Sequence, residues 1–171
     1  MSTSESNEHE MSSDVVVDAL HSIVFGGIAM TASALHRATG EQELTFTQWR
    51  AILFVGESAE GSRVSDVADR LMGSLSATSR LLRRLEDRGL LTLERDEKDR
   101  RATRARLTVE GRQLREAVLG WRRQQIVDIT RDVIVEPEVE RALVALAARF
   151  EERGRQSGHK ASDRRAPSTD V

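Results

Sequence analysis

Residues 74–111 carry the sequence SLSATSRLLRRLEDRGLLTLERDEKDRRATRARLTVEG, in which a helical pattern is followed by a strand pattern. Ser74 is a favoured residue at the start of a helix, and Gly89 is a residue that commonly follows its end. Between them apolar residues recur at helical spacing, which leaves the opposite face polar and basic. Residues 91–95 and 104–107 then alternate apolar and polar side chains around a charged run. This stretch predicts a helix followed by a two-stranded hairpin with a basic tip.

Two shorter helices are predicted before this stretch. Thr45 and Gln48 form a capping box, in which each side chain satisfies a backbone group of the first turn, and the helix ends before Gly56. Apolar residues between 64 and 71 give a further helix of about two turns, which Gly73 closes. Two helices joined by a tight turn and followed by a hairpin define a winged helix-turn-helix. We therefore expect a mainly α-helical fold that contains this motif.

Long helices are expected on both sides of the winged helix-turn-helix. Apolar residues form a wide stripe from Val16 to Arg37, and a second stripe follows Pro137, a residue suited to the first position of a helix. One small core cannot cover both stripes, so we expect the chain to dimerise through these helices. The expected organisation is a disordered acidic lead over 1–13, dimerisation helices over 14–40 and 108–155, a winged helix-turn-helix DNA-binding region over 44–107 and a disordered tail over 156–171.

The basic residues are unevenly distributed along the chain. The 171 residues include 26 bases and 28 acids, and the formal net charge of -2 gives no sign of a nucleic-acid partner. Residues 1–62, however, contain nine acids and two bases, whereas residues 63–106 contain twelve bases and eight acids. Nearly all the bases are Arg, which either suits phosphate and guanine recognition or reflects the coding composition of the genome. The predicted winged region is thus the basic part of the chain.

Several classes of protein are excluded or disfavoured. The absence of cysteine rules out disulfide scaffolds, Cys-based zinc fingers and thiol redox switching. No stretch approaches the roughly 20 apolar residues of a membrane span, and the N-terminus is acidic where a signal peptide needs basic and then apolar residues. We therefore expect a cytoplasmic protein with no membrane partner.

No catalytic motif stands out in the sequence. The four His residues lack the spacing of a metal site, and the turn between Gly56 and Gly61 lacks the Lys and hydroxyl residue of a phosphate-binding loop. A nucleophile elbow and a Cys nucleophile are also missing. We expect no enzyme activity, no metal and no cofactor.

The polar face of the predicted helix 74–87 has the features of a DNA recognition helix. Small residues at its start allow close approach in a major groove about 12 Å wide. Arg80 could reach a guanine, and Leu75 either contacts a thymine methyl or packs as a staple. A charged hairpin alone is usually a solvated turn, but here it follows a helix with a polar, basic face, which favours a DNA-binding wing. The candidate DNA-binding residues are Ser74, Leu75, Ser76, Ala77, Ser79, Arg80, Arg83 and Arg84 in the helix, and Arg95, Lys98, Asp99, Arg100 and Arg101 in the hairpin.

A further set of motifs runs along the chain: Leu44-Thr45 with Gln48, Val67-Ala68-Asp69-Arg70-Leu71, Ser79-Arg80-Leu81-Leu82, Leu85-Glu86, Gly89-Leu90, Arg95-Asp96, Asp99-Arg100-Arg101, and Leu107-Thr108 with Gly111. Through these motifs the chain resembles, over roughly residues 15–155, the MarR family of transcriptional regulators. The resemblance implies an obligate homodimer with interlocked terminal helices, and most often a repressor. It also implies that Arg101 enters the minor groove and that Asp99 is the acid that holds the shape of the wing.

The resemblance further implies a small-molecule effector that binds between the first, second and fifth helices. Candidates are His21, Phe25, Met30, Phe46 and Trp49, which could instead be core or interface packing. A twofold dimer would read a pseudo-palindromic site on double-stranded DNA. We expect a repressor that an effector releases. The alternative is a helical dimer that acts through protein contacts, since Thr92 and Leu93 stand where wings of the family often carry bases.

Overall fold

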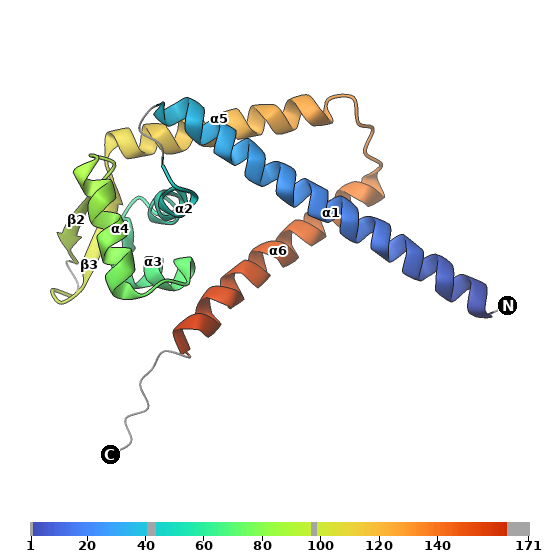
Figure 1. The fold of residues 1–171 in the computed structure, drawn as a ribbon, viewed down its shortest axis with the longest axis horizontal. Coiled ribbons are helices and arrows are strands. Elements are labelled where there is room, and N and C mark those ends of the chain that lie inside the picture. The colour runs from blue at the N-terminus through green and yellow to red at the C-terminus, as the bar shows by residue number, and fades with distance from the viewer. Residues whose placement is uncertain (1, 41–43, 97–98, 164–171) are drawn as a thin grey trace, which may run out of the picture.

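The computed structural model describes residues 2–40, 44–96 and 99–163, and shows a mainly helical fold with one small sheet (Figure 1). The mainly α winged helix-turn-helix architecture predicted from the sequence is confirmed. The elements are α1 (Ser2–Thr39), α2 (Phe46–Val55), β1 (Ser62–Arg63), α3 (Val64–Leu71), α4 (Leu75–Asp87), β2 (Leu91–Arg95), β3 (Thr103–Leu107), α5 (Val109–Thr130) and α6 (Pro137–Asp163).

The core lies between α2, α3, α4 and the sheet, and the ends of α1 and α5 close it. Ile52 from α2, Val67 from α3 and Leu82 and Leu85 from α4 are fully buried in it. Burial of each such side chain contributes about 1.5 to 3 kcal/mol to stability. This cluster fixes the tilt of α4 relative to the hairpin, and so fixes which face of α4 points to solvent.

The helix starts follow the local signals in the sequence. At α2, the Thr45 hydroxyl accepts a hydrogen bond from the Gln48 N–H at 3.2 Å, and the Gln48 side chain accepts one from the Thr45 N–H at 2.9 Å. At α4, the Ser74 hydroxyl accepts the Ala77 N–H at 3.2 Å. The predicted capping box and N-cap are therefore present.

The sheet has three strands, whereas the sequence predicts a two-stranded hairpin. β1 pairs with β3, with Ser62 opposite Ala105, and the order of the strands is β1-β3-β2. A strand of two residues is too short to show an alternating pattern, which is why sequence reasoning missed it. Gly61 makes the pairing possible, because it has a positive φ of 74° and a side chain there would collide with the Ala105 carbonyl.

The long helices form extended arms. Figure 1 shows α1 beside α5, while α6 returns from the far end of α5 and lies against α3. Both arms differ from the expected boundaries: α1 is helical from Ser2, across the expected disordered lead, and α6 continues to Asp163, into the expected tail. Glu is a good helix former and is favoured near a helix N-terminus, which is consistent with the longer α1. Residues 164–171 lie outside the described residues.

One arm also corrects the expectation about membrane-length segments. By length and composition, the segment Asp14–Thr39 of α1 could cross a membrane, with a mean hydropathy of 1.7 over its most apolar part. Sequence reasoning counted only the stripe of large apolar residues and overlooked that the positions between them are mostly Gly, Ala, Ser and Thr rather than charged. Only 6% of this part is buried within the chain. The segment therefore needs a covering surface that a single chain does not provide.

Candidate nucleic-acid interface

Helix α4 presents the predicted face to solvent. Thr78, Leu82 and Leu85 are buried, and Leu81 is half-buried on the same side. On the outer side Leu75 is 57% exposed, so it is a surface residue rather than part of the core. Two other candidates of this segment are half-buried, Ser74 and Ser79. The rest are exposed: Ser76, Ala77, Arg80, Arg83 and Arg84.

An open groove of about 340 Å³ lies between α4 and the hairpin. It brings together candidate residues that are distant in the sequence, with Ser79 and Arg83 on one wall and Asp99 and Arg101 on the other. Arg80 and Arg84 are not among its lining residues. The remaining lining residues are Val64, Ser65, Leu75, Leu93, Ala102 and Thr103.

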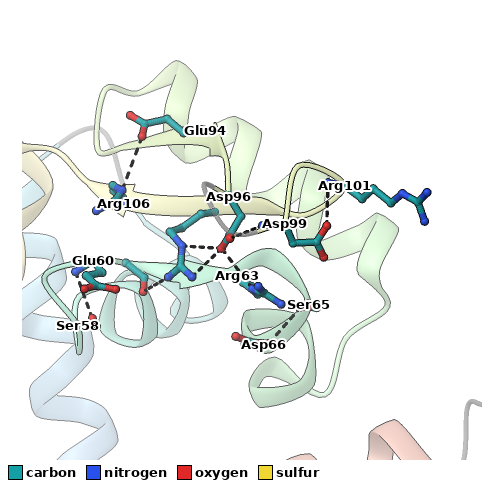
Figure 2. A network of polar contacts seen from close by, with 12 residues as sticks. Ser58, Glu60, Arg63, Ser65, Asp66, Glu94, Asp96, Asp99, Arg101 and Arg106 are labelled. Atoms are coloured by element: carbon teal, nitrogen blue, oxygen red, sulfur yellow. Dashed lines mark hydrogen bonds and ion pairs between the residues drawn. The ribbon is translucent and has the colours of Figure 1, made fainter.

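The base of the hairpin tip is organised around a buried carboxylate, Asp96, which is 2% exposed (Figure 2). Its Oδ2 accepts hydrogen bonds from Arg104 Nη2 at 2.7 Å and Nε at 2.9 Å, and from Arg63 Nε at 3.3 Å. Its Oδ1 accepts the Asp99 N–H at 3.0 Å. Sequence reasoning named Asp96 only within the Arg95-Asp96 motif of the resemblance and missed its burial, because strand alternation gives no signal for a buried acid just after the last residue of β2.

Backbone hydrogen bonds complete the tip. The Asp96 N–H donates to the Ala102 carbonyl at 2.9 Å, and the Ala102 N–H donates to the Asp99 carbonyl at 2.8 Å. The Asp99 side chain accepts the Arg101 N–H at 3.0 Å. Figure 2 shows the Arg101 side chain extending away from this network. Asp99 thus shapes the turn locally, as the resemblance implies, while Asp96 joins the turn to β1 and β3.

The arginines of this region fall into two groups. Arg63 and Arg104 are paired with Asp96, and Arg106 lies 3.7 Å from the carboxylate of Glu94. In the part of the chain that the structure describes, the second group forms no ion pair within 4 Å: Arg80, Arg83, Arg84, Arg95, Arg100 and Arg101. All six are exposed, on α4 or on the hairpin. Lys98, the remaining basic candidate, lies outside the described residues.

The candidate effector residues differ in their surroundings within the single chain. Trp49 is 1% exposed in the core, and Phe25 is 70% exposed on the free part of α1, where His21 is also exposed. Met30 is half-buried. Phe46 lines a cavity of about 200 Å³ between the end of α1 and the start of α2. The other residues that line it are Ala32, Leu35, His36, Thr39 and Leu44.

These features define a winged helix-turn-helix domain, in which one face of α4 is exposed and the hairpin is joined to β1. Residues 42–102 match the sequence model of the MarR family. The predicted resemblance is therefore confirmed, and the chain has the fold of MarR family transcriptional regulators. No curated protein sequence matches the chain.

Solved structures share this fold over most of their length. Rv1404 from Mycobacterium tuberculosis is 26% identical, with a TM-score of 0.67 over 84% of this chain and 94% of that one. CouR from Rhodococcus jostii RHA1, solved with p-coumaroyl-CoA, is 20% identical, with a TM-score of 0.65 over 83% and 93%. A point mutant of MepR from S. aureus, solved with an oligodeoxyribonucleotide, is 20% identical, with a TM-score of 0.57 over 80% and 96%.

Proposed function

We propose that this protein is a cytoplasmic, sequence-specific DNA-binding transcriptional regulator that acts as a homodimeric repressor. The observation that supports it best is the set of six exposed arginines without ion pairs on α4 and the hairpin. A guanidinium group without an acidic partner is available to bind phosphate or a base edge. Arg63, Arg104 and Arg106 of the same region are already paired with acids, so the six unpaired arginines are the ones available to bind DNA.

The two sides of α4 suit different parts of a DNA duplex. Arg83 and Arg101 lie on opposite walls of the groove, which suits one phosphate backbone running between the helix and the wing. Arg80 lies on the exposed side of α4 away from this groove. It is therefore the better candidate for a bidentate contact to guanine in the major groove.

Dimerisation is supported by the surface that the single chain exposes. Its accessible surface is 13167 Å², whereas a compact monomer of this size exposes about 8,400 Å². Obligate dimers commonly bury from about 2,000 to 5,000 Å² of such surface. The arms carry most of the large apolar residues that are exposed, among them Val16, Ile23, Phe25, Ile126, Ile129, Val139, Leu143 and Phe150. A second copy of the chain would cover them.

A twofold dimer would place two recognition helices on one face of the duplex. Symmetry then requires a pseudo-palindromic operator, with half-sites about one helical turn apart. We propose that an effector releases the repressor by changing the spacing of these helices. The cavity beside Phe46 lies between α1, which is one of the arms, and α2, which belongs to the proposed DNA-binding region. A ligand bound there would contact both, which supports this part of the proposal. CouR, which shares the fold, was solved with a small-molecule ligand.

Selection from a pool of random duplexes tests the proposed function. The expected result is a pseudo-palindrome that Arg101→Ala binds more weakly, while Arg131→Ala, which removes a charge from the exposed end of α5, binds it like the parent. If the parent selects no sequence, the proposed function is wrong and the protein-contact alternative gains support.

A further inference from the structure

The buried carboxylate of Asp96 is the point at which three segments of the DNA-binding region meet. We propose that Asp96 is a positioning residue, which fixes the wing so that Arg101 reaches DNA. The inference rests on the proposed function and assigns a role to a residue that itself is 2% exposed and does not line the groove.

The contacts of Asp96 connect the wing to elements outside the hairpin turn. Arg63, which holds one of its oxygens, belongs to β1 and is the residue that precedes α3. Arg104 lies in β3 and uses its third nitrogen, Nη1, to donate to the Gly61 carbonyl at 3.1 Å. The carboxylate therefore links the turn to β3 and, through Arg63 and Gly61, to the segment that leads into the helix-turn-helix.

The position of Arg101 depends on this link through a short chain of bonds. Asp96 accepts the Asp99 N–H, and Asp99 in turn accepts the Arg101 N–H. In Asp96→Asn, Arg63 and Arg104 would face each other as like charges, and the single amide oxygen could not accept from both the arginines and the Asp99 N–H, because these bind different oxygens of the carboxylate. The tip would then move away from β1, and Arg101 would leave the wall of the groove.

The sign of the effect on DNA binding separates positioning from simple electrostatics. Removing an acid from a DNA-binding face should strengthen binding when charge alone matters. Glu94 provides the matched control, because it lies on β2 of the same hairpin, 58% of its side chain is exposed and it pairs with only one arginine. Glu94→Gln should leave binding unchanged or slightly tighter, whereas Asp96→Asn should weaken it.

Affinity for the selected duplex is measured for the parent, Asp96→Asn, Glu94→Gln, Arg101→Ala and the double variant Asp96→Asn with Arg101→Ala. We expect Asp96→Asn to weaken binding about tenfold, as Arg101→Ala does, and each to lower the salt slope of the dimer by about 2, one for each copy of the wing. In the double variant the loss should be close to that of either single change. Binding of Asp96→Asn as tight as that of Glu94→Gln, or a double variant whose losses multiply, would overturn the proposal.

A second variant keeps the test decisive if Asp96→Asn fails to fold. Arg104→Lys retains the positive charge but loses the pair of guanidinium nitrogens that donate to Asp96. Circular dichroism establishes that each variant is folded at the temperature of the binding measurement. We expect folded Arg104→Lys to bind less tightly and with the lower salt slope, and parental binding would overturn the proposal. If Arg101→Ala binds the duplex weakly but Asp96→Asn binds it as tightly as the parent, only the positioning role is refuted. If the parent selects no duplex, the proposed function itself is refuted.

Discussion

The Thr108 hydroxyl donates a hydrogen bond of 2.7 Å to the carbonyl oxygen of Gly89, which follows the C-cap residue of α4. The same hydroxyl accepts the Gly111 N–H at 3.0 Å as the N-cap of α5. One side chain thus joins the end of α4 to the start of α5, which belongs to the proposed dimerisation arms. The start of α5 is therefore fixed to the corner that follows α4.

Substitution of Thr108 tests this connection. Thr108→Val keeps the shape of the side chain but removes both hydrogen bonds, so we expect a loss of about 1 to 2 kcal/mol in the free energy of unfolding. Urea denaturation measures it. Thr130→Val is the matched control, because that hydroxyl donates to the carbonyls of Ile126 and Val127 in its own helix. A loss no larger than that of the control would refute the role given to Thr108.

Gly111 marks the close approach of α5 to the corner after α4. A side chain there would collide with the Leu90 carbonyl oxygen, so we expect Gly111→Ala to destabilise the fold by about 1 to 3 kcal/mol. Gly120 lies in the same helix with open space around its backbone. Gly120→Ala should therefore raise stability by up to about 1 kcal/mol. Thermal denaturation of both variants checks this prediction, which equal shifts would contradict.

Arg80 is expected to read one base pair. Arg80→Ala should lose about 1 to 3 kcal/mol on the preferred duplex and discriminate less at a single position of each half-site. Affinities for a set of duplexes substituted one position at a time measure this change. A uniform loss on all duplexes would instead assign Arg80 to a phosphate.

The exposed apolar face of α1 is expected to be the dimer interface. Phe25→Glu places a charge where the second copy would pack, so we expect it to shift sedimentation toward the monomer. Val109→Glu is the control, since Val109 is also an exposed apolar residue, 53% exposed, but lies at the start of α5 beside the winged region. A Phe25→Glu variant that remains dimeric would contradict this assignment of the interface.

Sequence reasoning located the elements whose signals are local. The capping box at Thr45, the N-cap at Ser74 and the glycine after α4 each act within a few residues, and the structure has the corresponding helices at those places. The exposed face of α4 followed from the spacing of Thr78, Leu82 and Leu85.

Features that depend on contacts distant in the sequence were not predictable in this way. β1 exists because Gly61 allows the chain to approach β3, and Asp96 is buried because Arg63 and Arg104 converge on it from other segments. The candidate effector residues were grouped by helix, and the structure buries Trp49 while it exposes Phe25. Helix assignment alone does not reveal which side chains share a cavity.

The salt dependence of binding to the selected pseudo-palindrome tests the central claim most directly. For the dimer, we predict that the affinity falls steeply and linearly on a logarithmic scale as salt rises, and that Arg101→Ala lowers the slope by about 2, one for each copy of the wing. A scrambled duplex should bind far more weakly at every salt concentration. Equal affinity for both duplexes, or a slope that Arg101→Ala leaves unchanged, would contradict the account.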